Sequence, residues 1–216
     1  MNTLTLRALR LIPLPIAAAV AGCGTTSPAP MLLTLPHAAA VAAPSAPAPA
    51  VAGAPASKVM VLRRIEVPEY LAARRVRYRA DASTLAEWPN TYWAERIEIG
   101  VSREFAAALR QQLPGWRLCE AHCSEQAPAL ATQVELTQMD FVRGEQRLLA
   151  RAQLAVWSAD RTPRLLRSQE QAYVIAGQAA TPQAQAEAIT ELLRRVAADL
   201  AALAQGAAAP AAAPPR

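Results

Sequence analysis

The sequence predicts a protein of the α/β class: a single compact domain in which two amphipathic helices pack on one β-sheet that contains an antiparallel meander. Three segments, 131–142, 148–157 and 165–175, alternate apolar and polar residues as half-buried strands do. Two others, 93–112 and 182–205, repeat apolar residues at the spacing of one helix face. A chain of 216 residues allows one such domain besides its terminal segments.

Two strands are expected before the first helix. Residues 59–67 form an apolar run that is typical of a buried strand and stops at Pro68, and residues 76–79 alternate as a half-exposed strand. Residues 85–92 are irregular, and Trp88-Pro89-Asn90 predicts a turn. The first helix is expected to begin at Trp93 and to end at Pro114-Gly115, with an apolar face of Ile97, Val101, Phe105, Ala108, Leu109 and Leu113.

A further strand at 116–118 and the meander follow this helix. Turn-forming residues gather at Arg143-Gly144-Glu145 and at 159–163, between the strands of the meander. Thr181 is the expected cap of the second helix, Pro182 its first residue and Gln205-Gly206 its end. The predicted order is therefore two strands, a helix, four strands and a helix.

The N-terminal segment has the layout of a cleavable secretory signal. Arg7 and Arg10 precede an apolar run, 11–20, that is too short to span a bilayer. Val20-Ala21-Gly22-Cys23 resembles a bacterial lipobox, in which the cysteine is acylated and becomes the new N-terminus. We expect residues 1–22 to be removed and acyl chains on Cys23 to anchor the protein. The alternative is an ordinary signal peptide in which Cys23 is incidental.

Flanking segments rich in alanine and proline are expected to lie outside the folded domain. Residues 23–57 predict an extended tether, which at full stretch could reach about 100 Å from the membrane. Residues 206–216 predict a disordered tail, so the folded domain is expected over 58–205. By resemblance to lipoproteins of bacteria with two membranes, Gly24 in place of Asp favours the outer membrane, with the protein facing the periplasm.

Charge and cysteine content restrict the function classes. The net charge of +5 includes two arginines of the signal, and the other arginines are scattered, which argues against nucleic-acid binding. Besides Cys23, the chain has Cys119 and Cys123, which predict a short disulfide loop in an oxidising compartment. Two alternatives stay open, a pair of free thiols and a metal site with His122, although the spacing is unlike that of a structural zinc site.

The sequence holds no pattern that predicts catalysis. It has no glycine-rich phosphate loop, no paired-carboxylate constellation and no histidine cluster with metal-ligand spacing. The two histidines are His37, in the predicted tether, and His122, in the cysteine loop. We therefore expect no enzyme activity, no metal and no cofactor.

Four motifs in order resemble a known family. They are Ile65-Glu66-Val67-Pro68-Glu69-Tyr70-Leu71, Val76-Arg77-Tyr78-Arg79, Trp93-Ala94-Glu95, and Leu113-Pro114-Gly115-Trp116 at the end of the first helix. Together with the lipobox and the terminal helix, they resemble the PqiC/YmbA-type lipoproteins, or ABC-type transport auxiliary lipoproteins. The alanine- and proline-rich flanks and the Cys119–Cys123 loop depart from that pattern.

The resemblance implies a small α/β sandwich with a mixed sheet and a non-enzymatic role in intermembrane phospholipid transport. It implies that the lipoprotein meets a periplasmic MCE-domain (mammalian cell entry) protein of an inner-membrane complex, and that copies can form a ring. Tyr70 and Leu71 are candidate partner-binding residues, although they could equally cap the sheet. Trp88 is expected to be the exposed tryptophan and Trp93 a core residue. Two alternatives remain: a lipid carrier that holds an acyl chain, and a generic structural lipoprotein of the envelope.

Overall fold

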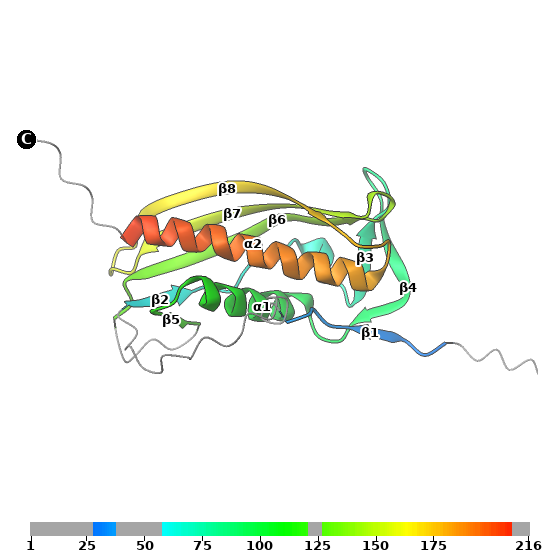
Figure 1. Ribbon diagram of the computed structural model, residues 1–216, viewed down its shortest axis with the longest axis horizontal. Helices are drawn as coiled ribbons and strands as arrows, with labels where there is room; N and C mark the ends of the chain where they lie inside the picture. The colour runs from blue at the N-terminus through cyan, green and yellow to red at the C-terminus, as the bar shows by residue number, and fades with distance from the viewer. Residues whose placement is uncertain (1–27, 38–57, 121–126, 209–216) are drawn as a thin grey trace, which may run out of the picture.

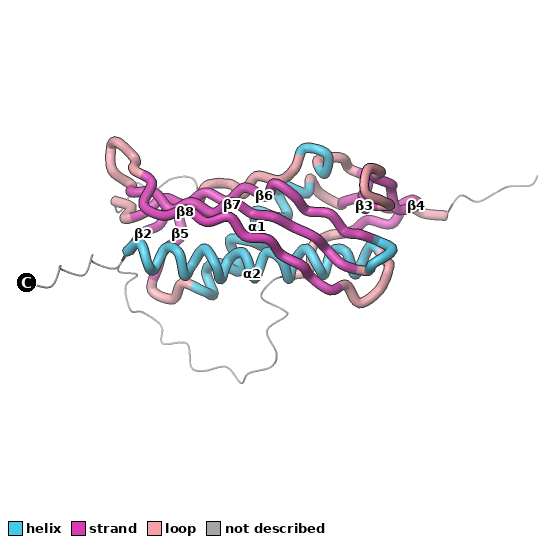
Figure 2. The backbone as a smooth tube through the Cα atoms, turned by 90° about the horizontal axis from the view of Figure 1, so that it is seen from above, coloured by secondary structure: helices cyan, strands magenta, loops and turns pink. Residues whose placement is uncertain are grey.

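Two layers make up the described part of the chain, residues 28–37, 58–120 and 127–208 of the computed structural model (Figure 1). One layer is an eight-stranded mixed sheet, and the other consists of helices α1 (Ile97–Gln112) and α2 (Pro182–Ala208), which pack against each other on one face of the sheet (Figure 2). This confirms the predicted class, a single α/β domain with a mixed sheet and two helices. Among the described helices, neither is long and apolar enough to cross a membrane.

Strand β6 (Leu130–Val142) organises the sheet. On one edge it pairs along its whole length with β7 (Arg147–Ser158), which pairs in turn with β8 (Leu165–Ala176), so the predicted antiparallel meander is present. On the other edge, two strand groups divide its length. The start of β6 pairs in parallel with β2 (Lys58–Leu62), which also pairs with β5 (Trp116–Cys119); its end meets β3 (Arg75–Arg79), which pairs with β4 (Leu85–Trp93).

Strand β4 occupies the stretch that the sequence indicated as irregular. Arg75 pairs with Tyr92 and Arg77 with Glu87, so the residues between 87 and 92 bulge out of the ladder. Asn90 adopts a φ of 50° within this bulge, a left-handed conformation that asparagine tolerates better than most residues. The bulge and Pro89 interrupt the alternation of side chains, which explains why no strand could be recognised there.

Residues 28–37, which the sequence placed in the tether, belong to the fold. Strand β1 (Met31–Leu33) pairs in parallel with the end of β4, and Leu33 and Leu35 are buried in the core. The prediction that the folded part begins at residue 58 is therefore wrong. Three strand residues are too few to show periodicity in an alanine- and proline-rich setting, and tertiary contacts alone define this strand.

Both helices differ from their predicted bounds. Helix α1 begins at Ile97 because Trp93 still belongs to β4, and α2 continues to Ala208, past the predicted stop at Gly206. The core lies between the helices and the sheet, and every second side chain of β7 is buried in it. It is made largely of leucine, valine and alanine, with Phe105 and Phe141 among the largest fully buried side chains. The opposite face of β6, β7 and β8 carries mostly polar side chains.

Candidate docking site

Two of the three predicted contact residues lie in the core. Trp88 is only 4% exposed and Leu71 only 8%, so the expectation that Trp88 is the exposed tryptophan is wrong. The bulge of β4 directs the Trp88 indole toward α2, where its Nε1 donates a hydrogen bond to Gln185 Oε1 at 2.7 Å. Gln185 Nε2 in turn donates to the carbonyl of Arg77 at 2.7 Å. Trp88 thus joins the sheet to α2, while Trp93 is buried as expected.

Tyr70 is half-buried and belongs to a polar network around Asp140. The Tyr70 hydroxyl donates to Asp140 Oδ1 at 3.1 Å, Arg79 Nη2 donates to the same oxygen at 2.8 Å, and Gln138 Nε2 donates to Oδ2 at 3.0 Å. Burial of the hydroxyl raises the pKa of Tyr70. Asp140 is 6% exposed, and both of its carboxylate oxygens accept hydrogen bonds. The network therefore fixes η1 (Glu69–Leu71) to β6.

Arg143, which the sequence indicated only as part of a turn, covers the aromatic pair Tyr78 and Trp88. Its guanidinium lies 4.7 Å from the ring centre of Trp88 and 5.1 Å from that of Tyr78. Both distances suit cation–π contact. The cluster combines residues from β3, β4 and the turn after β6, and no local sequence pattern could bring them together.

A second feature, which we call the basic groove, runs between α1 and the segment after β2. Its volume is about 450 Å³. Its floor is apolar, its rim carries four arginines and one acid, and Ile99 is exposed beside it. The residues that line it are Leu62, Arg63, Arg64, Ile65, Ile99, Ser102, Arg103, Phe105, Ala106, Arg110 and Glu120.

The charges of the basic groove are only partly balanced. Arg103 bridges Glu95 at 2.7 Å and Glu104 at 2.9 Å, and Arg110 pairs with Glu120. Arg63 and Arg64 are exposed and form no ion pair with any described residue. The Ser102 hydroxyl, on the groove side of α1, is buried and has no hydrogen-bond partner within the described ranges. Counting described residues alone, the groove therefore combines an apolar floor, two arginines without an ion pair and a hydroxyl without a hydrogen bond.

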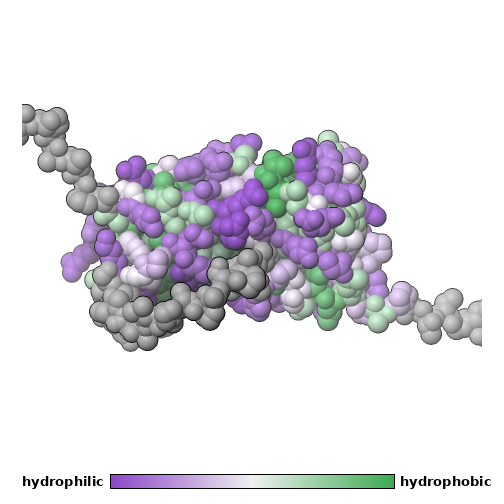
Figure 3. Space-filling view, in the orientation of Figure 1, coloured by the Kyte–Doolittle hydropathy of each residue, from purple (hydrophilic) through white to green (hydrophobic). Residues whose placement is uncertain are grey.

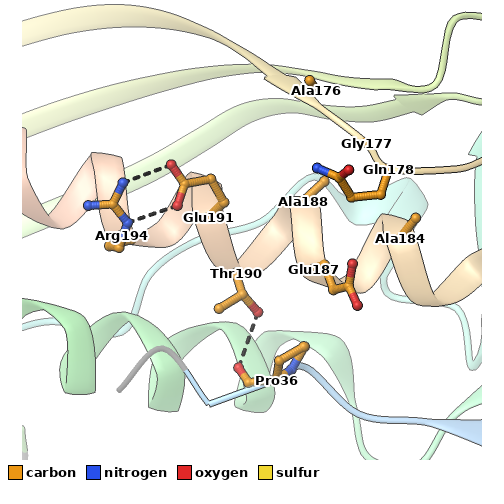
Figure 4. A pocket seen from close by; sticks show the side chains of 10 residues that line it. All are labelled: Pro36, Ala176, Gly177, Gln178, Ala184, Glu187, Ala188, Thr190, Glu191 and Arg194. Atoms are coloured by element: carbon orange, nitrogen blue, oxygen red, sulfur yellow. Dashed lines mark hydrogen bonds and ion pairs between the residues drawn. The ribbon is translucent and has the colours of Figure 1, made fainter. Parts of the chain in front are cut away.

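An apolar slot lies on the other helix, between α2 and the end of β8 (Figure 4). Its volume is about 400 Å³. Pro36, Ala184 and Ala188 form much of its wall, and Thr190 Oγ1 donates to the carbonyl of Pro36 at 3.2 Å. The ion pair between Glu191 and Arg194, at 2.8 Å, closes its polar rim. The slot is a surface feature, and the buried apolar residues of the described chain form one continuous core cluster.

The cysteines are described only in part. Cys119, at the end of β5, is disulfide-bonded. Its predicted partner Cys123, together with His122, and the predicted lipidation site Cys23 lie outside the described residues. Within the described ranges, no group of histidine, cysteine, aspartate and glutamate side chains could hold a metal ion.

The fold and the surface features define a class of protein, a compact α/β head with open surface grooves. The particular family follows from comparison: the sequence model of the ABC-type transport auxiliary lipoprotein component matches residues 42–201, and the chain belongs to this family. The family is a transport auxiliary component and not a family of enzymes. Strand β1 lies outside the matched residues.

Solved structures share the fold at low sequence identity. The crystal structure of an uncharacterized protein is 14% identical with a TM-score of 0.63, and the match covers 81% of this chain and 98% of the other. Protein XCC0632 from Xanthomonas campestris, of family DUF330, is 11% identical with a TM-score of 0.58, over 82% of this chain and 98% of that one. No curated protein matches the chain.

Proposed function

We propose that this chain is an outer-membrane lipoprotein, acylated at Cys23, that docks a periplasmic MCE-domain protein of an intermembrane phospholipid transport system. Membership of the transport auxiliary lipoprotein family carries this proposal. A ring of several copies at the end of the partner belongs to the same proposal.

The basic groove is the proposed docking surface, in place of Leu71 and Trp88. Partner-binding surfaces present apolar anchors within reach of charges that select the partner. Here the exposed Ile99 supplies the apolar anchor, and Arg63 and Arg64 supply positive charge that no described acid balances. The expected partner segment is therefore amphipathic and acidic. Tyr70 supports the fold through its hydrogen bond to Asp140.

Photocrosslinking in living cells tests this surface. A photoreactive residue at Ile99, which is 42% exposed, is compared with one at Val174, which is 57% exposed on the opposite face of the sheet. We expect an adduct with an MCE-domain protein from position 99 only, and loss of most of it when Arg63 and Arg64 are both replaced by glutamate. Adducts from position 174 alone, or an unchanged yield in the charge-reversed variant, would reject the groove.

The apolar slot favours one second candidate, a carrier that holds a single acyl chain. Its volume is at the lower end of the range for small-molecule pockets, and its walls are largely apolar. Native mass spectrometry of the mature chain, compared with an Ala188→Phe variant that fills the slot, distinguishes the two functions. Co-purified lipid that disappears in the variant would support carriage; no bound lipid in either protein would leave docking as the function.

A further inference from the structure

The folded domain binds the chain only a few residues after Cys23, the proposed lipidation site. Asn90 Nδ2 donates to the carbonyls of Pro28 and Ala29 at 2.7 and 2.9 Å, and Ala94 N donates to the carbonyl of Leu33 at 2.9 Å. Leu33 and Leu35 then enter the core, and Gln183 Nε2 of α2 contacts Met31 Sδ at 3.1 Å. The chain is therefore fixed to the domain from Pro28 onward.

Covalent geometry then limits how far this end can lie from the membrane. Residues 24–27 are all that separates Cys23 from Pro28. At no more than ~3.6 Å per residue, five Cα–Cα steps reach about 18 Å. This is far shorter than the tether of about 100 Å that the sequence suggested. Residues 38–57 connect β1 to β2 and add nothing to the reach of the anchor.

The surface at this end has the chemistry of a membrane interface. Leu32 is 59% exposed and Met31 is also exposed, on a strand that forms the edge of the sheet. Figure 3, in the orientation of Figure 1, shows hydrophobic surface toward the β1 end of the molecule. Beside β1, Arg75 lies over the ring of Tyr92 at 5.3 Å and pairs with Glu87 at 3.2 Å. Apolar side chains next to an aromatic ring and an arginine are typical of the headgroup region of a bilayer.

We propose that the end of the molecule formed by β1, the end of β4 and Arg75 is a membrane-contact surface. Leu32 and Met31 enter the headgroup region of the phospholipid leaflet that holds Cys23, and Arg75 faces lipid phosphate. The inference rests on the acylation of Cys23 in the proposed function. It goes beyond the family, because β1 precedes the residues that the family model matches.

This contact sets the orientation of the whole head. Helix α2 runs from the β1 end toward the opposite end of the long axis (Figure 1). Its 27 residues span about 40 Å. The C-terminal end of α2 and the start of β8 therefore point away from the membrane, and the basic groove along α1 stays open to the periplasm.

Two exposed leucines at opposite ends provide a matched test. Leu32 is 59% exposed at the β1 end, and Leu165 is 49% exposed at the start of β8, near the C-terminal end of α2. The acylated full-length protein, with a photoreactive residue at one position or the other, is reconstituted into vesicles of phosphatidylethanolamine and phosphatidylglycerol. Lipid adducts are counted by mass spectrometry, which also reports the acyl mass on Cys23. A third protein has photoreactive position 32 and a flexible insertion of about twenty residues after Thr26.

We expect several-fold more lipid adducts from position 32 than from position 165, and a several-fold loss when the linker is lengthened. Equal yields from both positions in acylated protein would overturn the contact surface and leave the docking proposal intact. If the protein with the lengthened linker gives as many lipid adducts from position 32, the short connection to Cys23 does not cause the contact, and that part of the inference is overturned. Absence of the acyl mass would overturn both this inference and the lipoprotein anchor on which it rests.

Discussion

The Trp88 side chain carries a hydrogen bond that a surface residue would not need. Its Nε1 is the donor for the buried Gln185 Oε1. Replacing Trp88 by phenylalanine leaves that oxygen without a donor, and we expect a loss of about 1–3 kcal/mol in the free energy of unfolding, plus a packing cost. Denaturant unfolding measures it. Trp157→Phe is the matched control, because the Trp157 indole nitrogen has no described partner; equal losses in both variants would contradict the role of the hydrogen bond.

Tyr70 should make the fold less stable at alkaline pH. Burial raises its pKa above the ordinary value of 10.0. Because the pKa of Tyr70 is higher in the folded than in the unfolded state, its contribution to stability is complete below the unfolded-state pKa. That contribution is lost as pH rises through the folded-state pKa. Tyr70→Phe should therefore lower stability by about 1 kcal/mol at neutral pH and should reduce its decline above about pH 10. Unfolding curves at a series of pH values test this, and parallel declines in both proteins would contradict it.

Gly177, after β8, is held against backbone and an aromatic ring. A Cβ at this position would lie 3.0 Å from the carbonyl oxygen of Gln146 and 3.0 Å from the ring of Phe141. Neither group can move easily, so Gly177→Ala should cost about 1–3 kcal/mol. Gly144→Ala is the control, because a Cβ there meets no atom within 4 Å. Similar melting temperatures for the two variants would show that the chain relaxes around Gly177.

Local sequence predicted single residues only where the neighbours along the chain decide the environment. Trp93 precedes an apolar helix face and is in the core as expected. Trp88 is beside Pro89, which indicated an exposed turn, yet contacts with α2 bury it. Asp140 and Gln185 could not be assigned roles, since the partners that tie them to other elements are 61 to 108 residues away along the chain. The same applies to the basic groove, which joins three separate segments.

At the scale of elements, β1 is the sharpest difference between the expected and the observed fold. Leu35, which follows β1, is 4% exposed, whereas Leu32 within the strand points outward. Leu35→Ala should therefore cost about 2–4 kcal/mol, and Leu32→Ala less than about 0.5 kcal/mol. Chemical denaturation of the mature chain measures both. If Leu35→Ala is as mild as Leu32→Ala, residues 28–37 are not part of the cooperative fold.

Elements with a clear local pattern were predicted, including the short strands β2, β3 and β5, whereas β1 and the irregular β4 were not. The meander strands and both helices repeat their apolar residues over ten or more positions, so their type and place follow from the pattern. Strand β4 was missed because its bulge breaks the period, and β1 because it has three residues. The terminal helix continues through Gly206 because neighbouring turns still pack, with Ala204 buried.

At the scale of the whole molecule, stability should decrease from the meander toward the β1 end. Strand β7 is paired on both edges and covered by α2, with Leu148, Leu154 and Val156 at or below 1% exposure. Strand β1 pairs on one edge only, with its three residues against β4. Amides with few buried neighbours exchange through local opening, so β1 should exchange much faster than β7 in solution.

Hydrogen exchange of the acylated protein with and without vesicles then separates local from global stability. Contact with lipid should slow the amides of β1 and of the end of β4, because their local opening breaks that contact. Amides of β7 that open only by global unfolding should slow by no more than the same factor, because lipid bound only to the folded head stabilises it against global unfolding as well. Equal slowing of β1 and β7 would mean that the membrane stabilises the head as a unit. Unchanged exchange at β1 would contradict the orientation in which this end of the long axis faces the bilayer.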